Sequence, residues 1–259
     1  MLPKTELLKG IEHSERISRV LDQVEQALKT WEVVPTDFLS PPELEEAKAC
    51  LAKLTEVSSV PWGGYPQAER QRLAIARAEL PLDPDQVTLT ALSIAGNFLF
   101  DPATHRDFLG ATLGTGIVRD KVGDILVLGE RGAQMIVVPE LAEFLQQNLT
   151  QVRTVPVRVT PIPFSELQVR EPRKKEIATV EASMRLDAIA SAGFGMSRSK
   201  MADLIQSGEV RVNWKDISQP SHLLKDGDLV AIRGKGRLYV GDVAVTKKNR
   251  YRVQLTRLS

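Results

Sequence analysis

The stretch SMRLDAIASAGFGMSRSKMADLIQSGEVRVNWKDISQPSHLLKDGDLVAIRGKG, residues 183–236, decides the fold of the C-terminal third of the chain. Its apolar spacing predicts a helix that carries Arg185 and breaks at Gly193 and Gly195. A second helix is predicted to open at Ser197, a residue type favoured at helix N-caps. The stretch therefore predicts two short helices followed by strands.

Basic residues recur along this layout. Gly208 is expected to end the second helix, and a strand with Arg211 follows. An arrangement of this kind aligns cationic donors on one face, which is what the backbone of a structured RNA requires. The sequence predicts RNA contacts by Arg185, Ser197, Arg198, Lys200, Arg211, Asn213, Lys215, Arg233, Lys235 and Arg237.

The stretch resembles the RNA-binding domain named after small-subunit ribosomal protein S-four, also called the alpha-L motif. Helix order, glycine positions, basic positions and the Gly227-Asp228 pair before a strand all agree with that domain. One position departs from it, because similar sequences have glycine where this chain has Trp214. Since glycine tolerates the positive φ of a tight hairpin, the local turn geometry is an open question.

Three details of this region are open to more than one interpretation. Asp187 is expected to orient a neighbouring arginine or cap a turn, and the alternative is a role as an acid. Trp214 either packs against a helix or stacks on a base. The residues 233–237 either extend the RNA-binding groove or form a solvated edge.

The charge distribution points to the same region. The 259 residues carry a net charge of only +1. Residues 173–259, however, contain 17 Lys and Arg against 9 Asp and Glu, a net +8, whereas the preceding part contains 17 against 24, a net −7. A polyanionic partner is therefore expected to meet the C-terminal third.

The remainder of the chain predicts an α+β protein. We expect helices over residues 5–56, with Ser40 as an N-cap, and either a strand or a helix end over residues 73–77. The order strand-helix-strand-strand-helix-strand over residues 86–159 is ferredoxin-like, with a helix start at Asp101. The predicted division is a helical N-terminal region at 1–84, a ferredoxin-like or RRM-like domain at 85–160, a linker at 161–180, and the alpha-L domain at 181–259.

The sequence contains no constellation typical of catalysis. It lacks the common phosphate-binding, zinc-protease and serine-hydrolase motifs, and three His with one Cys make a metal site improbable. His105, Arg106 and Asp107 are consecutive on a predicted helix, so their side chains point in different directions and cannot converge on one atom. We predict no enzyme activity, no cofactor and no metal.

A second resemblance covers most of the chain. The segments GGYPQAER (residues 63–70) and HRDFLGATLGTGIVRDKVGDILV (residues 105–127), together with the terminal domain, resemble the YlmH family. That resemblance implies non-enzymatic binding of structured RNA, rRNA or tRNA or both, on the large ribosomal subunit in translation or ribosome-associated quality control. Relatives of this size also form a cyanobacterial and plastid branch associated with photosystem II.

Two rival functions follow from the same sequence. One is an RNA-modifying enzyme with its active site in the central domain, and the other is an assembly factor for photosystem II. The chain has no apolar run long enough to span a membrane and no signal peptide, so we expect a cytoplasmic protein, in a cyanobacterial cytosol or a plastid stroma.

Overall fold

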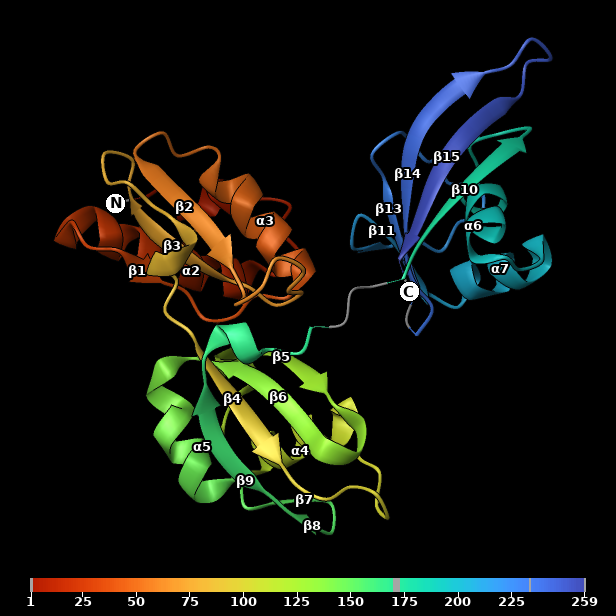
Figure 1. Ribbon diagram of the computed structural model, residues 1–259. Helices are drawn as coiled ribbons and strands as arrows, with labels where there is room; N and C mark the ends of the chain where they lie inside the picture. The colour runs from red at the N-terminus through yellow and green to blue at the C-terminus, as the bar shows by residue number, and fades with distance from the viewer. Residues whose placement is uncertain (1, 170–172, 233, 259) are drawn as a thin grey trace. The chain divides into compact units, whose positions relative to one another are not determined.

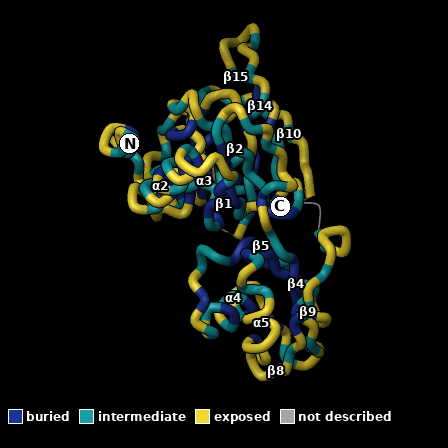
Figure 2. Tube along the Cα trace, turned by 90° about the vertical axis from the view of Figure 1, so that its left-hand side faces the viewer, coloured by how far each residue is buried: buried dark blue, intermediate teal, exposed yellow. Residues whose placement is uncertain are grey.

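The computed structural model describes residues 2–169, 173–232 and 234–258 (Figure 1). The chain divides into two compact units, Met1–Val169 and Arg170–Ser259, and each has apolar core clusters of its own. Figure 2 shows buried stretches by strands β1 (Val34–Pro35), β4 (Thr90–Ala95) and β5 (Val122–Val127). None of the described helices is long and apolar enough to cross a membrane.

The first part of unit 1 combines the predicted helices with a small sheet. Ser40 caps its third helix as expected, because the Glu43 carboxylate accepts hydrogen bonds of 2.6 Å from both the backbone N–H and the hydroxyl of Ser40. The chain also forms an antiparallel sheet of order β1-β3-β2, of which the sequence offered only residues 73–77 as a possible strand, and these residues do lie in strand β3. The elements are α1 (Lys4–Leu7), α2 (Ser14–Thr30), β1 (Val34–Pro35), α3 (Pro41–Leu51), β2 (Val57–Trp62) and β3 (Arg72–Arg77).

The second part of unit 1 has the predicted ferredoxin-like topology. Its four strands are antiparallel in the order β5-β6-β4-β9, which is the order expected when two strand-helix-strand units share one sheet. The main elements are β4 (Thr90–Ala95), α4 (His105–Gly114), β5 (Val122–Val127), β6 (Gly132–Val137), α5 (Ala142–Asn148) and β9 (Arg158–Ile162). Between them lie η1 (Pro84–Gln86), η2 (Arg119–Lys121), η3 (Gly129–Arg131), η4 (Pro139–Leu141), β7 (Gln151–Val152), β8 (Val155–Pro156) and η5 (Phe164–Glu166).

Helix α4 begins later than the sequence predicts. Asp101 is not its N-cap, because α4 starts at His105 and Thr104 takes the cap position. Asp107 completes a capping box there by accepting hydrogen bonds from the backbone N–H and hydroxyl of Thr104, at 2.8 and 2.7 Å. The Asp101 carboxylate instead accepts a hydrogen bond of 2.7 Å from Arg153. A complete capping box therefore outweighs the isolated Asp-Pro signal.

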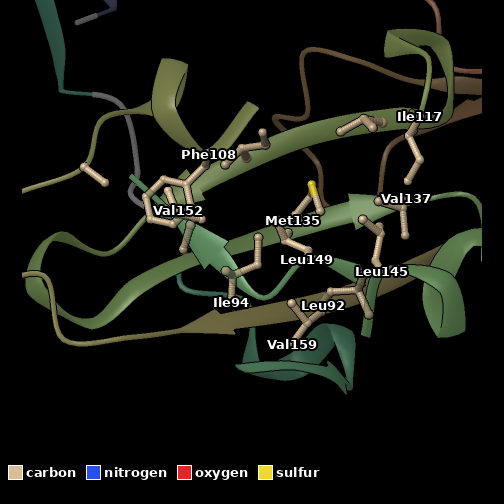
Figure 3. Close-up of a cluster of buried hydrophobic side chains, with 14 of the residues drawn as sticks. Leu92, Ile94, Phe108, Ile117, Met135, Val137, Leu145, Leu149, Val152 and Val159 are labelled. Carbon is tan, nitrogen blue, oxygen red and sulfur yellow. The ribbon is translucent and has the colours of Figure 1, made fainter. Parts of the chain in front are cut away.

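The two faces of the four-stranded sheet are covered differently. On one face, the core lies between the sheet and helices α4 and α5, and Figure 3 labels Leu92, Ile94, Phe108, Ile117, Met135, Val137, Leu145, Leu149, Val152 and Val159. On the other face, Phe38 and Ile136 are fully buried in one small apolar cluster. Gln134 is also covered there, since its amide donates to the Glu166 carbonyl at 2.9 Å and accepts from the Gln168 N–H at 2.6 Å. The chain itself therefore occupies the face that RRM domains use for RNA.

Unit 2 is a six-stranded antiparallel sheet of order β10-β15-β14-β13-β11-β12 with two helices on one face (Figure 1). The predicted linker at 161–180 contains most of its first strand, which pairs along its whole length with the last strand. The elements are β10 (Lys174–Glu181), α6 (Leu186–Phe194), α7 (Arg198–Gln206), β11 (Val210–Val212), β12 (Lys215–Asp216), β13 (Leu229–Ile232), β14 (Gly236–Val245) and β15 (Tyr251–Leu258).

Gly193 marks a close approach of α6 to the sheet. The sequence predicts a helix break at Gly193 and Gly195, but only Gly195 ends the helix, with φ of 68°. Gly193 lies inside α6, and a Cβ added there would come within 2.2 Å of the buried Leu238 side chain. The absence of a side chain at this position therefore sets how closely α6 packs on β14.

Candidate nucleic-acid interface

The N-terminal ends of α6 and α7 meet at a buried carboxylate. Asp187, in the first turn of α6, is only 7% exposed. Its carboxylate accepts hydrogen bonds from Nε and Nη2 of Arg185, at 3.1 and 3.0 Å. It also accepts from Nη2 of Arg198, at 3.1 and 3.2 Å to its two oxygens. We call Arg185, Asp187 and Arg198 the arginine clamp, in which Asp187 has the orienting role that the sequence suggested.

The electrostatics of the arginine clamp favour a charged Asp187. Burial alone would raise the pKa of the Asp187 carboxyl, but the hydrogen bonds and positive charges of Arg185 and Arg198 outweigh burial and lower it. The side chains of Arg185 and Arg198 remain 39% and 56% exposed. Each guanidinium has five N–H donors, so those not used on Asp187 can bind an anion from solvent.

This pairing predicts a pH-dependent share of the stability of unit 2. The pKa of Asp187 is lower in the folded than in the unfolded chain, so its contribution is complete above the unfolded value of about 3.9 and is lost as pH falls through the folded value. We expect Asp187→Asn to be less stable than the wild type at neutral pH and to lose less stability on acidification. The urea concentration at the midpoint of unfolding, measured for the wild type and for Asp187→Asn between acidic and neutral pH, gives the difference in stability. If the midpoints of the two proteins change with pH in parallel, an ionised Asp187 does not stabilise the fold.

The first turn of α7 presents a second set of donors. Ser197 is the N-cap, and its hydroxyl accepts a hydrogen bond of 3.3 Å from the Lys200 N–H. No acid lies in this turn, and Lys200 is exposed. Within the described part of the chain, Lys200 forms no ion pair. A free ammonium beside a helix N-terminus is a favourable arrangement for phosphate.

The hairpin between β11 and β12 forms a tight two-residue turn in spite of its tryptophan. Asn213 and Trp214 both adopt positive φ, 49° and 67°. Both ends of the Asn213 side-chain amide are hydrogen-bonded within the fold, since it donates to Asp228 at 2.8 Å and accepts from the Leu229 N–H at 2.9 Å. The Trp214 ring lies 5.1 Å from the guanidinium of Arg237, a cation–π distance. Asn213 therefore acts first as a turn residue.

The sheet separates the remaining predicted contacts. Arg211 pairs across the sheet with Ala231, and Ala231 with Arg237, so these side chains share the face opposite the helices. Arg211 also forms an ion pair with Asp216 at 2.7 Å. Lys215 pairs with a core residue of β11 and projects on the helix side. The helix side thus carries Arg185, Ser197, Arg198, Lys200 and Lys215, while the open face carries Arg211 and Arg237.

Two further predicted contacts are Arg233 and Lys235. Arg233 is outside the described residues. Lys235 is half-buried, and its carbonyl accepts a hydrogen bond of 3.3 Å from Arg257. Sequence reasoning missed Arg257, which also donates to the Phe194 carbonyl at 3.1 Å and lies 5.2 Å from the Phe194 ring. Strand alternation could have revealed it, because Arg257 continues the inward-facing positions of β15.

In unit 1, the two segments that resemble the YlmH family meet around Asp124. Its carboxylate accepts hydrogen bonds from the Tyr65 hydroxyl and the Glu69 N–H, both at 2.7 Å, and from the Arg70 N–H at 3.1 Å. Arg119 donates to the same stretch through backbone carbonyls, and burial followed by the nearby charge of Arg70 lowers the pKa of Arg119 to about 10. These contacts fasten the loop at residues 63–70 to strand β5.

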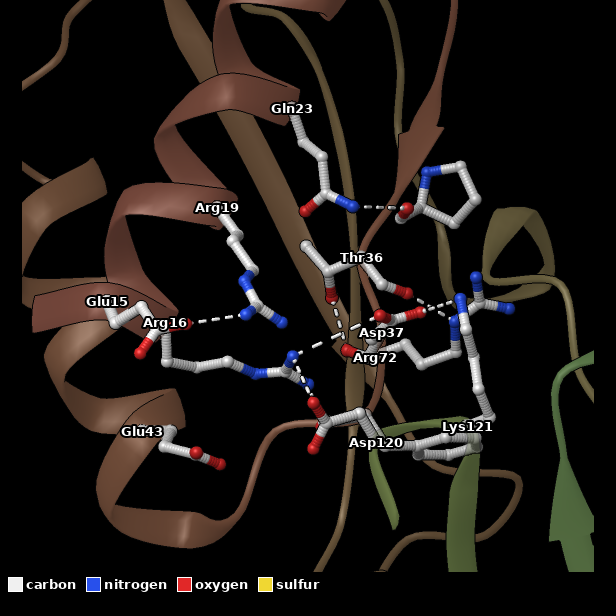
Figure 4. A network of polar contacts seen from close by, with 12 residues as sticks. Glu15, Arg16, Arg19, Gln23, Thr36, Asp37, Glu43, Arg72, Asp120 and Lys121 are labelled. Atoms are coloured by element: carbon white, nitrogen blue, oxygen red, sulfur yellow. Dashed lines mark hydrogen bonds and ion pairs between the residues drawn. The ribbon is translucent and has the colours of Figure 1, made fainter. Parts of the chain in front are cut away.

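A polar network next to this cluster joins α2 to the start of β5 (Figure 4). Arg16 on α2 forms an ion pair of 2.7 Å with Asp120 and donates to the Phe38 carbonyl at 2.8 Å. Lys121 reaches Asp37 at 2.6 Å. Because these groups satisfy one another across the two parts of unit 1, we interpret the network as a scaffold that orders the family segments.

His105 and Asp107 are the residues most easily taken for catalytic ones in unit 1. His105 is exposed at the first position of α4, and Asp107 is held by its capping box. Among the described residues, no cluster of three His, Cys, Asp or Glu could hold a metal ion. A hollow of about 360 Å³ on the covered sheet face has Glu166 as its one acidic lining residue. General acid–base catalysis by paired carboxylates has no counterpart there.

Three family models match consecutive parts of the chain. They are described as YlmH, N-terminal (residues 12–80), Putative RNA-binding domain in YlmH (residues 84–166) and S4 domain (residues 184–230). The matches cover both units but end before β14 and β15.

Similar proteins match between about a fifth and nine tenths of this chain. Ribosome-associated protein quality control protein P2 of Bacillus subtilis is 32% identical over 242 residues, which is 90% of this chain and 93% of that protein. Small ribosomal subunit protein uS4 of Thermoanaerobacter sp. is 39% identical over 54 residues, 20% of this chain and 26% of that protein. The structure of Cell division protein ylmH from Streptococcus pneumoniae aligns with a TM-score of 0.54 at 22% identity, covering 62% of this chain and 96% of that one.

Proposed function

The chain belongs to the YlmH family, and from this premise we propose that it is a non-enzymatic protein that positions itself on structured RNA of the ribosome. RNA binding and association with ribosomes follow from its RNA-binding domains and from the relative in Bacillus subtilis. The finer proposal is that the RNA is rRNA, tRNA or both, on the large subunit, in translation or in quality control. We expect the protein to act in the cytoplasm.

The arginine clamp is the single observation that best supports this proposal. A buried Asp187 holds Arg185 and Arg198 in fixed directions at the ends of two helices, and Lys200 lies on the same helix as Arg198. Oriented guanidinium groups lose less side-chain entropy when they bind phosphate than free ones do. The unit that carries the clamp also has the excess of positive charge. Its expected ligand is therefore the phosphate backbone of a folded RNA.

In the proposed mechanism, the protein binds RNA and is positioned on it without catalysing a reaction. Contacts from unit 2 fix the protein on an RNA surface, and unit 1 meets a second RNA or protein surface. The face of the central sheet is covered by Phe38 and by the segment at residues 163–168, so base stacking there is not part of the proposal. Any RNA contact of unit 1 is expected on its helices or loops.

Sedimentation with ribosomal particles tests this function against its rivals. We expect the full chain to co-sediment with large subunits and to be released by nuclease or by moderately raised salt, because phosphate contacts dominate. Association with a membrane or pigment complex that survives nuclease would favour the photosystem II assembly role. A modified nucleoside produced by the purified protein from rRNA or tRNA, and lost in His105→Ala, would favour the RNA-modifying enzyme.

A further inference from the structure

The hairpin formed by β14 and β15 extends beyond the helix-covered part of the sheet (Figure 1). We call residues 241–252 the arm. Its strands remain paired as far as Val245 and Tyr251, after a register shift between Val240 and Val243. Gly241 lies at this irregularity. The arm lies outside residues 184–230, which match the S4 domain model.

Beyond Asp242, the arm carries positive charge without an acidic residue of its own. Asp242 is the last acidic residue of the chain. Beyond it, Lys247, Lys248, Arg250 and Arg252 are all exposed, and none forms an ion pair within the part of the chain that the structure describes. Arg257, further along the same strand, is instead bound to backbone carbonyls of the core. The four cations are therefore available to a partner, in contrast to Arg257.

The tip of the arm is an ordered turn. The Thr246 N–H donates to the Arg250 carbonyl at 2.7 Å, and the Asn249 N–H donates to the Thr246 carbonyl at 2.9 Å. The Arg250 N–H also donates to the Thr246 hydroxyl at 3.1 Å. Asn249 adopts φ of 58°, which asparagine tolerates better than most residues. The turn thus fixes the backbone that carries the cations before any ligand binds, which reduces the entropy lost on binding.

We propose that the arm is a second RNA-binding element, whose tip binds the phosphate backbone of duplex RNA at a point distinct from the arginine clamp. The proposal rests on the proposed RNA-binding function and adds a surface to it. An RNA partner is favoured because three of the five residues of the tip, 246–250, are exposed cations and none of the five is aromatic or large and apolar, the kind of anchor that protein interfaces use.

The test compares three variants of the full chain, and the combination of the first two, on one RNA hairpin with a stem of about 20 base pairs, long enough for two contact points. The arm variant is Lys247→Ala/Lys248→Ala/Arg250→Ala. The clamp-side variant is Lys200→Ala. The matched control, Lys174→Ala/Lys175→Ala/Lys225→Ala, removes the same number of exposed cations from unit 2, outside both the arm and the predicted contact set. Binding is measured as a function of salt concentration, and thermal melting checks that each variant folds.

We expect the arm variant to bind at least about tenfold more weakly and to lower the log–log salt slope by about 2, because three phosphate contacts of ~0.7–0.9 each are removed. Its melting temperature should stay unchanged, since the tip is exposed. The control should bind within about twofold of the wild type. The weakening from the arm and Lys200→Ala should add when combined, as for separate contacts.

Failure of the arm and failure of the RNA-binding function give different results. If Lys200→Ala weakens binding but the arm variant keeps the wild-type affinity and slope, the arm inference is wrong while RNA binding stands. If the matched control weakens binding as much as the arm variant, the effect is one of net charge and the arm has no special role. If the wild type itself binds no structured RNA, the proposed function fails.

Discussion

The fragment 173–259 is expected to bind structured RNA at least about tenfold more tightly than the fragment 1–169 at ~0.15 M salt, where phosphate contacts are only partly screened. The first fragment carries a net charge of +8, the arginine clamp and a core of its own. The second belongs to the net acidic part of the chain. Binding of both fragments to one rRNA hairpin, followed by fluorescence anisotropy, measures the difference.

A variant of the basic fragment separates local contacts from bulk charge. Lys225 is exposed in unit 2 but lies outside the predicted contact set, so Lys225→Ala provides the control for Lys200→Ala. Both remove one positive charge, and only Lys200→Ala should weaken binding clearly. Equal affinity of the two fragments, or equal effects of the two substitutions, would argue against a site in unit 2.

Gly132→Ala is expected to destabilise unit 1 by about 3 kcal/mol or more, the largest stability effect that we predict for a single methyl group. Gly132 begins β6 with φ of 111°, and a Cβ there would lie 2.0 Å from the backbone carbonyl oxygen of Ile94 on the neighbouring strand. A backbone oxygen held in a sheet cannot move aside as a side chain can. Denaturant unfolding of the full chain measures the change.

Gly110→Ala is the matched control for this prediction. Gly110 lies inside α4, and a Cβ added there meets no atom within 4 Å. The same chemical change should therefore stabilise the helix by about 0.5–1 kcal/mol, because alanine loses less backbone entropy than glycine. Opposite signs for the two substitutions are expected, and similar small effects would show that the sheet tolerates a side chain at position 132.

The central fold was predictable because its signals are local. Alternating apolar residues mark strands such as β4, and glycines separate β5 from β6, so the ferredoxin-like order follows from the chain alone. The N-terminal sheet was not predictable in the same way. Strand β2 contains two serines and a proline, and β3 is buried on both faces and lacks alternation. Such strands are defined by pairing with distant residues, which periodicity does not report.

The candidate site was predictable in its residue types but not in its pairings. The cations Arg198 and Lys200 follow from their place at a helix start, yet only the structure shows that Arg198 is bound to Asp187 while Lys200 is exposed. The contact between Trp214 and Arg237 depends on sheet register, which residues distant in sequence determine. The arm was missed because its cations lie beyond the region that resembles the alpha-L motif.

The salt dependence of RNA binding by Lys200→Ala, measured in the full chain, tests the central claim most directly. Lys200 is exposed and has no ion pair within the described residues, so its removal should leave folding unchanged. The account predicts weaker binding to every structured RNA and a log–log salt slope lower by about one contact, ~0.7–0.9. An unchanged slope and affinity in a folded variant would contradict the claim that the start of α7 binds RNA phosphate.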